Sequence, residues 1–361
     1  MRKICVPVMS RANWGRLKMV LKAIQENKGL ELQLIIGGSA LLPRFGVKHD
    51  IEKSGFKIAG EIWCTIEGDK HECMATTTGL LTTQLVQYFN ILKPDIVLVH
   101  ADRYEMLAIA TAASYMGIPL AHTQGGEVSG NIDDKVRNSI TMLSDIHFPA
   151  TVTALWRLKD YGICPDRIFN VGCPTIDFLV EMNQIEPNPD PYLMVVMHPV
   201  TTDNENARKM SEILHTIDYF GMKTIWIHSN VDAGNTQVNE HVKSIIKAHN
   251  MQNIEFLDSI SPEEYYSKMK NTMCLIGNTS SGLREGLALG TPYVCLGDRQ
   301  ANREHGSNVK FVKNYDFVEL KEAIEWQMGR KYEYDGRFGD GTAGKQIAKI
   351  LSTIEVKSCK Y

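Results

Sequence analysis

The chain has 361 residues, of which 43% are apolar and 22% are charged, and its formal net charge is −3. These values are typical of a soluble globular protein with two domains, and they give no reason to expect a nucleic-acid partner or a membrane surface. No apolar stretch reaches 18 residues, so we expect no membrane span. The first apolar run is interrupted at Ser10-Arg11, too soon for a signal peptide.

The first half of the chain alternates short β-branched runs with longer amphipathic stretches. Strands are predicted at 3–8, 31–37, 95–100, 118–122, 146–149 and 168–171. Helices are predicted at 14–27, 76–92, 103–116, 134–143 and 152–161. Alternation of this kind indicates a parallel sheet with crossover helices.

A proline-rich stretch at 186–191 breaks the pattern and is typical of a linker. A second series follows, with strands at 192–197, 223–228, 254–257, 273–276 and 293–296. Its helices are expected at 204–220, 235–249, 262–270, 281–289, 317–328 and 343–354. We therefore predict an α/β protein with two doubly wound, Rossmann-like domains facing across a cleft. The predicted domains are 1–185 and 192–342, and a C-terminal segment, 343–361, packs back on the first domain.

The eight cysteines are scattered without a Cys-x-x-Cys pair, and most of them lie in apolar runs, as Cys274 does. This pattern favours reduced thiols packed as small hydrophobic groups in a cytoplasmic protein. The chain also has no His-x-x-x-His motif and no Cys/His cluster, so we expect no metal site.

Residues 122–134 form the most informative segment, His-Thr-Gln-Gly-Gly-Glu-Val-Ser-Gly-Asn-Ile-Asp-Asp, which directly follows an apolar run. Its two adjacent glycines allow a turn where a Cβ would clash. Several protonatable groups on a tight turn at a strand end are what acid/base chemistry needs. Gln124 is the exception, because an amide cannot titrate. The titratable residues are His122, Glu127, Asp133 and Asp134.

Polar residues follow other predicted strands and should reach the same cleft, because ligands of doubly wound folds bind at the carboxyl ends of strands. Asp102 follows the strand 95–100, where it is either a helix N-cap or an active-site carboxylate. His198 and Asn230 end strands of the second half and are ligand candidates.

A phosphate site is predicted after the strand 273–276. Hydroxyl groups there, at the start of a predicted helix, lie next to free N–H groups that a diphosphate could bind, although a plain helix cap has the same pattern. Glu285 could accept hydrogen bonds from a ribose diol. Arg11 and Arg299 also follow predicted strands and could pair with phosphate oxygens. The helix-start residues are Asn278, Thr279, Ser280 and Ser281.

Nearly the whole chain, from Arg11 to about residue 340, resembles the hydrolysing UDP-N-acetylglucosamine 2-epimerases, which include bacterial enzymes of sialic acid synthesis. The motifs that carry the resemblance are Asp102-Arg103, Gly125-Gly126-Glu127-Val128-Ser129-Gly130, Ile132-Asp133-Asp134, His198-Pro199-Val200-Thr201-Thr202-Asp203, Asn230-x-Asp232-Ala233-Gly234, and the run from Gly277-Asn278 to Arg284-Glu285. The resemblance implies a glycosyltransferase-B fold, with chemistry mainly in the first domain and nucleotide binding mainly in the second.

The resemblance also implies a reaction. UDP leaves C1 as the C2 proton is removed, and water adds to the resulting glycal to give the free 2-epimer, of the N-acetylmannosamine type. The family's catalytic carboxylates fall on Asp102 and Asp133, while a third, a glutamate, falls on Gln124. Its nucleotide contacts fall on Arg11, Arg103, His198, Asn230, Thr279, Ser280, Glu285 and Arg299.

Gln124 leaves three hypotheses open. It could orient the acetamido group while Glu127, Asp133 or a histidine, His122 or His147, transfers the proton. It could mark a subfamily that acts on a 2,4-diacetamido-trideoxyhexose bound for legionaminic acid, or the protein could have little activity.

Three other functions compete with a hydrolysing epimerase. They are a non-hydrolysing epimerase, which keeps UDP on its product, a glycosyltransferase of the same fold, and a nucleotide-sugar-binding regulator. We expect no cofactor, because epimerisation with hydrolysis needs no redox group, and arginines with a helix N-terminus can meet the diphosphate charge. The expected partners are a nucleotide-sugar substrate and further copies of the chain, in a homodimer or homotetramer.

Overall fold

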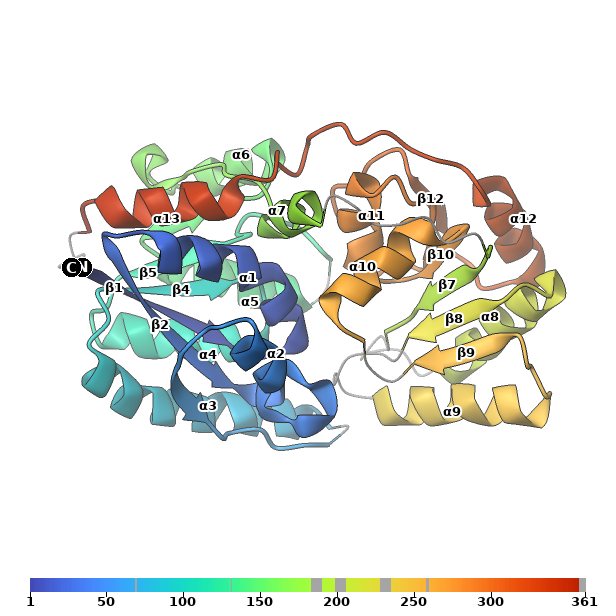
Figure 1. Cartoon of the computed structure of the whole chain (residues 1–361), viewed down its shortest axis with the longest axis horizontal. Coiled ribbons are helices and arrows are strands. Elements are labelled where there is room, and N and C mark those ends of the chain that lie inside the picture. The colour runs from blue at the N-terminus through green and yellow to red at the C-terminus, as the bar shows by residue number, and fades with distance from the viewer. Residues whose placement is uncertain are drawn as a thin grey trace. The chain divides into compact units, whose positions relative to one another are not determined.

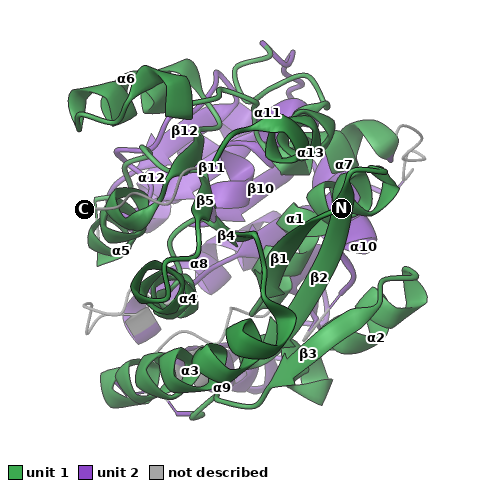
Figure 2. Cartoon of the chain, turned by 90° about the vertical axis from the view of Figure 1, so that its left-hand side faces the viewer, with its two compact units in different colours: residues 1–67, 71–181, 336–361 green, residues 68–70, 182–335 purple. Residues whose placement is uncertain are grey.

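A computed structural model of the chain describes residues 1–68, 70–130, 132–182, 190–198, 206–227, 235–257 and 260–356. The chain divides into two compact units, shown in separate colours in Figure 2. Unit 1 comprises Met1–Glu67, His71–Glu181 and Gly336–Tyr361, and unit 2 comprises Gly68–Lys70 and Met182–Asp335. Within the described ranges, no helix is both long enough and apolar enough to cross a membrane. Most of the expected linker, 186–191, lies outside those ranges.

Unit 1 contains a parallel sheet of six strands in the order β3-β2-β1-β4-β5-β6 (Figure 1). The strands are β1 (Arg2–Val8), β2 (Leu30–Gly37), β3 (Ile58–Ile62), β4 (Ile96–His100), β5 (Leu120–Thr123) and β6 (Ile146–Phe148). The helices are α1 (Arg11–Glu26), α2 (Val47–Lys53), α3 (His71–Leu92), α4 (Tyr104–Tyr115), α5 (Ile132–Leu143), α6 (Val152–Asp160), α7 (Pro174–Glu181) and α13 (Ala343–Thr353), with 3-10 turns η1 (Gly38–Leu41), η2 (Pro43–Phe45) and η3 (Pro165–Arg167). Parallel strands require crossovers, and these helices supply them.

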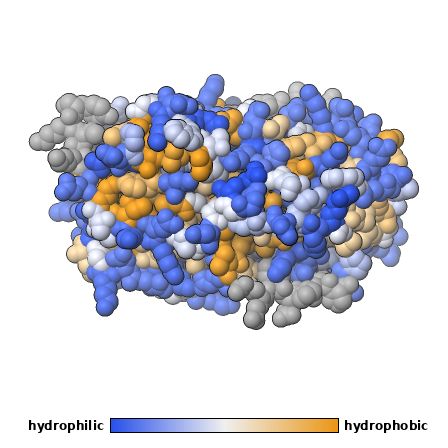
Figure 3. Space-filling model, turned by 90° about the horizontal axis from the view of Figure 1, so that it is seen from above, coloured by the Kyte–Doolittle hydropathy of each residue, from blue (hydrophilic) through white to orange (hydrophobic). Residues whose placement is uncertain are grey.

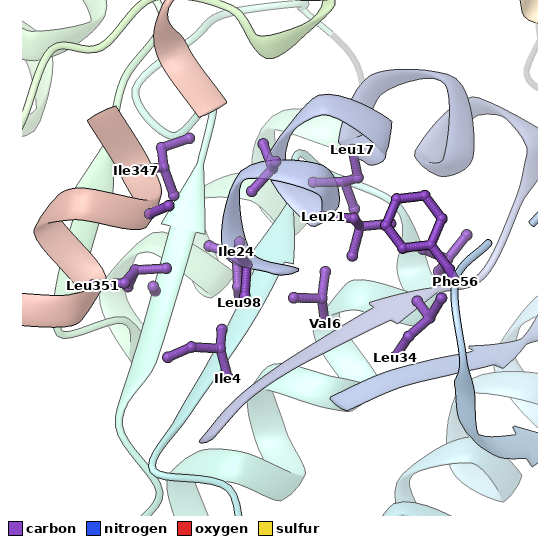
Figure 4. Packing of buried hydrophobic residues seen from close by; sticks show 14 of the residues in the cluster. Ile4, Val6, Leu17, Leu21, Ile24, Leu34, Phe56, Leu98, Ile347 and Leu351 are labelled. Carbon is purple, nitrogen blue, oxygen red and sulfur yellow. The ribbon is translucent and has the colours of Figure 1, made fainter. Parts of the chain in front are cut away.

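The C-terminal helix α13 completes the hydrophobic core of unit 1. Figure 4 shows Ile347 and Leu351 near Ile24 of α1, in the same cluster of fully buried residues. The close packing of α13 on α1 requires Gly344, since a Cβ there would lie 2.8 Å from the carbonyl oxygen of Met19. Burial of these side chains is worth roughly 1.5–3 kcal/mol each.

Charged side chains of opposite sign bind the two ends of α13. Asp177 accepts hydrogen bonds from Ala343 N (3.0 Å) and Gly344 N (2.6 Å) at the N-terminus. Arg2 donates to Leu351 O (2.6 Å) and Ile354 O (2.9 Å) at the C-terminus. Each charge offsets the partial charge of the helix end that it meets. The C-terminal part of unit 1 begins at Gly336, somewhat before residue 343, the expected start of the C-terminal segment.

Unit 2 has a second parallel sheet, in the order β12-β11-β10-β7-β8-β9. The strands are β7 (Leu193–Val196), β8 (Thr224–Ile227), β9 (Ile254–Leu257), β10 (Cys274–Gly277), β11 (Tyr293–Leu296) and β12 (Val309–Val312). The helices are α8 (Asn206–Phe220), α9 (Asn235–Ala248), α10 (Pro262–Asn271), α11 (Glu285–Ala288) and α12 (Phe317–Gln327), with one 3-10 turn, η4 (Ser280–Gly282). Both sheets have the strand order of a doubly wound Rossmann-like fold, so the predicted fold class is confirmed.

The structure corrects several predicted elements. Edge strands β3 and β12 were not predicted, because both have partly exposed, polar-containing sequences that lack a buried strand's apolar run. The predicted strand 168–171 is wrong, since only Ile168 forms a bridge, to His147. The predicted helix 281–289 is interrupted, because a 3-10 turn precedes the short helix α11.

The surface seen in Figure 3 is mostly hydrophilic, with apolar side chains in separate patches. Large exposed apolar residues of unit 1 include Trp63, Tyr115 and Trp156. Single exposed side chains of this kind are normal on folded proteins, so they do not mark a site by themselves.

Candidate active site

The sheet order of unit 1 creates a topological switch point between β1 and β4. Chain crossovers leave these two neighbouring strands in opposite directions, and doubly wound folds bind their ligands at the carboxyl ends of such strands. Arg11 begins α1 shortly after β1, and Asp102 follows β4. The segment 124–130 follows β5, the next strand of the sheet. Candidate residues from three parts of the sequence therefore lie along one edge of one sheet.

A buried arginine, Arg137 of α5, connects these segments. Its side chain is only 1% exposed, and its Nη2 donates to Oδ2 of Asp102 and to Oγ of Ser129 (3.2 Å). Its Nη1 donates to the carbonyl oxygen of Glu127 (2.8 Å) and to Oδ1 of Asp134 (2.5 Å). A planar guanidinium suits several acceptors at once, so Arg137 fixes the Asp102 carboxylate against the loop after β5.

The charges around Arg137 explain how the guanidinium is accommodated in the interior. Burial by itself lowers the pKa of Arg137, but the nearby carboxylates of Asp102 and Glu127 outweigh burial and raise the pKa above its usual value. The Asp102 side chain keeps 18% of its surface exposed, so it is partly open while its charge is paired.

Asp134 orders the loop that carries Glu127. Its carboxylate accepts hydrogen bonds from Ser129 N, Ser129 Oγ and Gly130 N, each at 2.7 Å. Burial raises the pKa of Asp134, but these bonds and that from Arg137 outweigh burial and hold the pKa below its usual value. Asp133, its neighbour in the first turn of α5, is half-buried. Of the adjacent pair Asp133-Asp134, Asp134 therefore has a structural role, and Asp133 is a second carboxylate beside it.

Two predicted residues after β4 have contacts that the sequence did not reveal. Asp102 is not a helix N-cap, because the N-cap position of α4 is Arg103, and the Asp102 carboxylate binds Arg137 instead. Arg103 itself forms a two-pronged ion pair with the buried Glu105, with both N···O distances at 3.0 Å. Arg11 begins α1, and its guanidinium lies 5.9 Å from the ring centre of Phe45.

His122 is a buried structural residue. Its Nε2 lies 2.8 Å from the carbonyl oxygen of Ala101, which can only accept, so Nε2 carries the proton. Nδ1 then accepts from the hydroxyl of Thr141 at 3.2 Å. Burial lowers the pKa of His122 to about 4, so the ring is neutral near pH 7. Both nitrogens are occupied within unit 1, which leaves neither for a substrate.

His147 on the neighbouring strand β6 is equally buried. It pairs in register with His122, and burial, followed by the proximity of that second imidazole, lowers its pKa to about 3. Proton transfer at neutral pH requires a pKa nearer to the working pH. The carboxylates therefore stand ahead of both histidines as acid/base candidates.

Gln124 lies in the interior at the start of the turn. It is 2% exposed, and its backbone has the left-handed φ of 62° that few non-glycine residues adopt. Its N donates to Phe148 O (2.9 Å), and its side-chain Nε2 donates to Sγ of Cys173 (3.1 Å). Gln124 is therefore held by one hydrogen bond from its backbone and another from its side-chain amide.

The two glycines after Gln124 are required by close packing. A Cβ on Gly125 would lie 2.9 Å from Thr141 Oγ1 and 3.0 Å from His122 Nδ1. Gly126 has φ of 80°, and a Cβ there would come within 2.4 Å of the carbonyl oxygen of Ala154. The turn predicted from the Gly-Gly pair is thus confirmed, and it is fixed by neighbours distant in sequence.

Unit 2 has its own switch point, between β7 and β10. His198 follows β7 and Asn278 follows β10, and the Asn278 side chain bonds both backbone groups of His198: Oδ1 accepts from N, and Nδ2 donates to O, each at 2.8 Å. This pair of bonds joins the two strand ends. The other predicted residue of this region, Asn230, lies outside the described residues.

The predicted phosphate segment of unit 2 adopts a tighter conformation than a long helix start. Thr279 caps the turn η4, and its Oγ1 accepts from Ser281 N at 3.3 Å, while Ser280 is half-buried. Glu285 begins α11 and has no exposed surface. Arg299 donates to the carbonyl oxygen of Asn278 at 3.0 Å. The residues of the predicted phosphate site are thus close together in unit 2. The helix α11 that follows them has too few turns for a strong helix dipole.

Sequence reasoning missed two residues, Arg137 and Cys173. The spacing of Arg137 from Asp134, three residues along one helix, was an available signal for an ion pair. No local signal identified Cys173, because its partner Gln124 lies 49 residues away in the sequence. Among the described residues, no three His, Cys, Asp or Glu side chains gather as a metal ion would require.

Comparisons with known proteins agree on one family. The sequence model described as UDP-N-acetylglucosamine 2-epimerase matches residues 22–352. A Campylobacter jejuni protein named GDP/UDP-N,N'-diacetylbacillosamine 2-epimerase (hydrolyzing) is 33% identical over 338 residues, covering 90% of this chain and 88% of the relative. A Legionella pneumophila protein named UDP-N,N'-diacetylbacillosamine 2-epimerase (hydrolyzing) is 29% identical over 372 residues, covering 99% and 97%.

Solved structures share the fold. The Methanocaldococcus jannaschii UDP-GlcNAc 2-epimerase in complex with UDP-GlcNAc and UDP matches with a TM-score of 0.83 and 19% identity, over 97% of this chain and 99% of that one. The Neisseria meningitidis UDP-GlcNAc 2-epimerase bound to UDP-GlcNAc matches with a TM-score of 0.81 and 17% identity, over 97% and 99%. The predicted glycosyltransferase-B fold and the family resemblance are both confirmed.

Proposed function

The chain belongs to the UDP-N-acetylglucosamine 2-epimerase family, and we propose that it is a hydrolysing 2-epimerase of a UDP-2-acetamido sugar. The observation that supports this most directly is the Asp102 carboxylate, partly exposed at a switch point and held by the buried Arg137. A carboxylate fixed in this way is suited to proton transfer at a carbon atom, because its orientation is set before the substrate arrives.

The reaction has two balanced steps. In the first, the bond from C1 to the diphosphate breaks, a proton leaves C2, and a glycal and UDP form. In the second, water adds across the double bond, with hydroxyl at C1 and a proton at C2 from the opposite face. We assign the two proton transfers at C2 to Asp102 and Asp133, with Glu127 as the next candidate. The net change is the UDP sugar plus water giving the free 2-epimer plus UDP.

We further propose that the sugar is a 2,4-diacetamido-2,4,6-trideoxyhexose. Both Campylobacter and Legionella relatives carry N,N'-diacetylbacillosamine in their names, and that name denotes such a sugar. Gln124, which stands where the resembled family has a glutamate, is a neutral amide suited to bind an acetamido group. On this proposal Gln124→Glu lowers turnover of the diacetamido substrate, and a large gain in turnover would contradict it.

Nucleotide binding is proposed for the residues at the strand ends of unit 2 and, on the family resemblance, for Arg11 and Arg103. The unit 2 residues are His198, Asn230, Asn278, Thr279, Ser280, Ser281, Glu285 and Arg299. Arg299→Ala should weaken binding of UDP measured by calorimetry about tenfold, the usual effect of losing one charged hydrogen bond. Unchanged affinity would remove Arg299 from the proposed site.

The decisive experiment is incubation of the protein with a panel of UDP and GDP sugars in D₂O, with products identified by NMR. A hydrolysing epimerase releases UDP and a free 2-epimer labelled at C2. A product that keeps UDP identifies the non-hydrolysing reaction instead, and transfer to an acceptor without label at C2 identifies a glycosyltransferase. Binding without release of UDP identifies a regulator.

A matched pair of variants tests the role of Asp102. Asp102→Asn should abolish elimination, whereas Asp95→Asn should not, because Asp95 is exposed before β4 and accepts from the backbone N of Lys3 at 2.7 Å. The substitution is the same, and the two positions flank the two ends of one strand. Wild-type rates from Asp102→Asn would remove this residue from the mechanism.

We also propose a homodimer or homotetramer. Light scattering during size-exclusion chromatography measures the mass directly, and a single species of 40.6 kDa, the mass of one chain, would refute this proposal.

A further inference from the structure

Gln124 and Cys173 form a hydrogen bond in the interior of unit 1, although 49 residues separate them in the sequence. The Nε2 of Gln124 donates to Sγ of Cys173 over 3.1 Å. Gln124 is 2% exposed and Cys173 has no exposed surface. A buried amide must place its donor and acceptor ends on suitable partners, so this contact decides which end faces where.

The direction of the bond is set by a third residue. The Cys173 thiol donates its only proton to Oγ1 of Thr175, with the two atoms 3.6 Å apart. The sulfur then has only lone pairs to offer Gln124, and it binds the NH₂ end of the amide. Since the amide is planar, its oxygen lies on the branch directed away from sulfur. Cys173 therefore occupies one N–H of the Gln124 amide and leaves the amide oxygen as its acceptor towards other groups.

The backbones on both sides of this contact are fixed. Cys173 N donates to Phe338 O at 2.7 Å. Next to it, a Cβ on Gly172 would lie 2.7 Å from Cα of Gly339, so only glycine allows this approach. Gln124 is in turn fixed by its bond to Phe148 O. With both backbones fixed, the thiol determines the orientation of the amide plane.

We propose that Cys173 is a positioning residue of the reaction: it holds the Nε2 of Gln124, so that the amide oxygen recognises an acetamido N–H of the substrate. This inference rests on the proposed function. An acetamido group offers one N–H donor, and an amide oxygen oriented in advance is a suitable acceptor for it. The predicted diacetamido sugar carries two such groups, and a glutamate at 124 could not donate to the sulfur.

The test compares Cys173→Ala, Cys173→Ser, Gln124→Ala and the double variant in steady-state kinetics of UDP release. Cys173→Ala should raise KM about fivefold, the effect of one hydrogen bond, and leave kcat within about twofold. Cys173→Ser should stay within about twofold of wild type in KM, because a hydroxyl also accepts and donates. In the Gln124→Ala background, Cys173→Ala should change KM no further.

Cys5→Ala is the matched control, because Cys5 is equally buried in unit 1 but lies within β1. It should leave KM unchanged. The proposal is overturned if Cys173→Ala changes KM by the same factor with and without Gln124, or if Cys173→Ser is no better than Cys173→Ala.

A second measurement separates failure of this inference from failure of the proposed function. If the wild-type protein releases UDP from no UDP sugar, the proposed function is wrong, and urea unfolding still tests the pairing of Cys173 with Gln124. A loss of stability from Cys173→Ala that shrinks in the Gln124→Ala background supports the pairing. Equal losses in both backgrounds overturn it.

Discussion

Replacing Arg137 by methionine removes the charge that holds the Asp102 carboxylate. The methionine chain fills much of the same space, so the main loss is electrostatic. Arg137 is 1% exposed, and its guanidinium serves Asp102, Asp134, Ser129 and the Glu127 carbonyl. Removing one partner of a buried ion pair costs about 3–5 kcal/mol. Because the Asp102 and Asp134 side chains are 18% and 23% exposed, water reaches them in part, which places the expected loss near 3 kcal/mol.

The loss in activity should exceed what instability alone explains. Misplacement of a reacting group by about 1 Å costs about 100-fold in rate, so kcat/KM of Arg137→Met should fall about 100-fold under conditions where the variant is folded. Urea unfolding followed by circular dichroism measures stability, and UDP release measures activity.

Arg44→Met is the control for loss of an arginine. Arg44 pairs with Glu67 across the surface, with side chains 54% and 48% exposed, and this loss should stay within about 1 kcal/mol. If Arg137→Met were no more destabilising than Arg44→Met, Arg137 would not be the central contact of this site.

Three further predictions follow from burial and packing. Since burial lowers the pKa of His122 to about 4, the unfolded chain binds a proton that the folded chain refuses. The contribution of His122 to stability is complete above about pH 6.5 and falls by up to about 3 kcal/mol towards pH 4. Urea unfolding of His122→Asn should therefore show a shallower pH dependence, of which the remainder comes from the buried His147. Gly126→Ala should cost about 1–3 kcal/mol more than Gly162→Ala, because both glycines have φ near 80° but only Gly126 has a carbonyl oxygen where the Cβ would lie. Asp177→Ala should cost about 0.5–2 kcal/mol by removing the N-terminal cap of α13, measured by thermal unfolding.

Each of these three predictions has a control variant or a result that would contradict it. The exposed His49→Gln should leave the pH dependence intact, and an equally steep loss in His122→Asn would exclude His122 as its source. Equal costs at Gly126 and Gly162 would show that backbone conformation alone, without the carbonyl of Ala154, sets the penalty. Asp160→Ala, at an exposed aspartate, should leave stability within about 0.5 kcal/mol, and an equal result for Asp177→Ala would refute the capping role.

The strand and helix pattern was readable from sequence because it depends on local periodicity. Central strands such as β4 are continuous apolar runs, and Ser10 and Thr151 accept hydrogen bonds at the starts of α1 and α6 as helix caps do. The edge strands β3 and β12 escaped prediction, since both are only partly buried and lack a continuous apolar run.

The sequence by itself also determined which polar residues follow strands, and hence that Asp102 and the loop carrying Glu127 share a sheet edge. Only the tertiary structure decided what each of them does. Arg137 becomes the partner of Asp102 because folding buries it beside a residue 35 positions away. His122 is neutral because folding removes water from it, and Gln124 is oriented because Cys173 arrives from a distant segment. Charge state and orientation depend on burial and on neighbours, neither of which is encoded in local spacing.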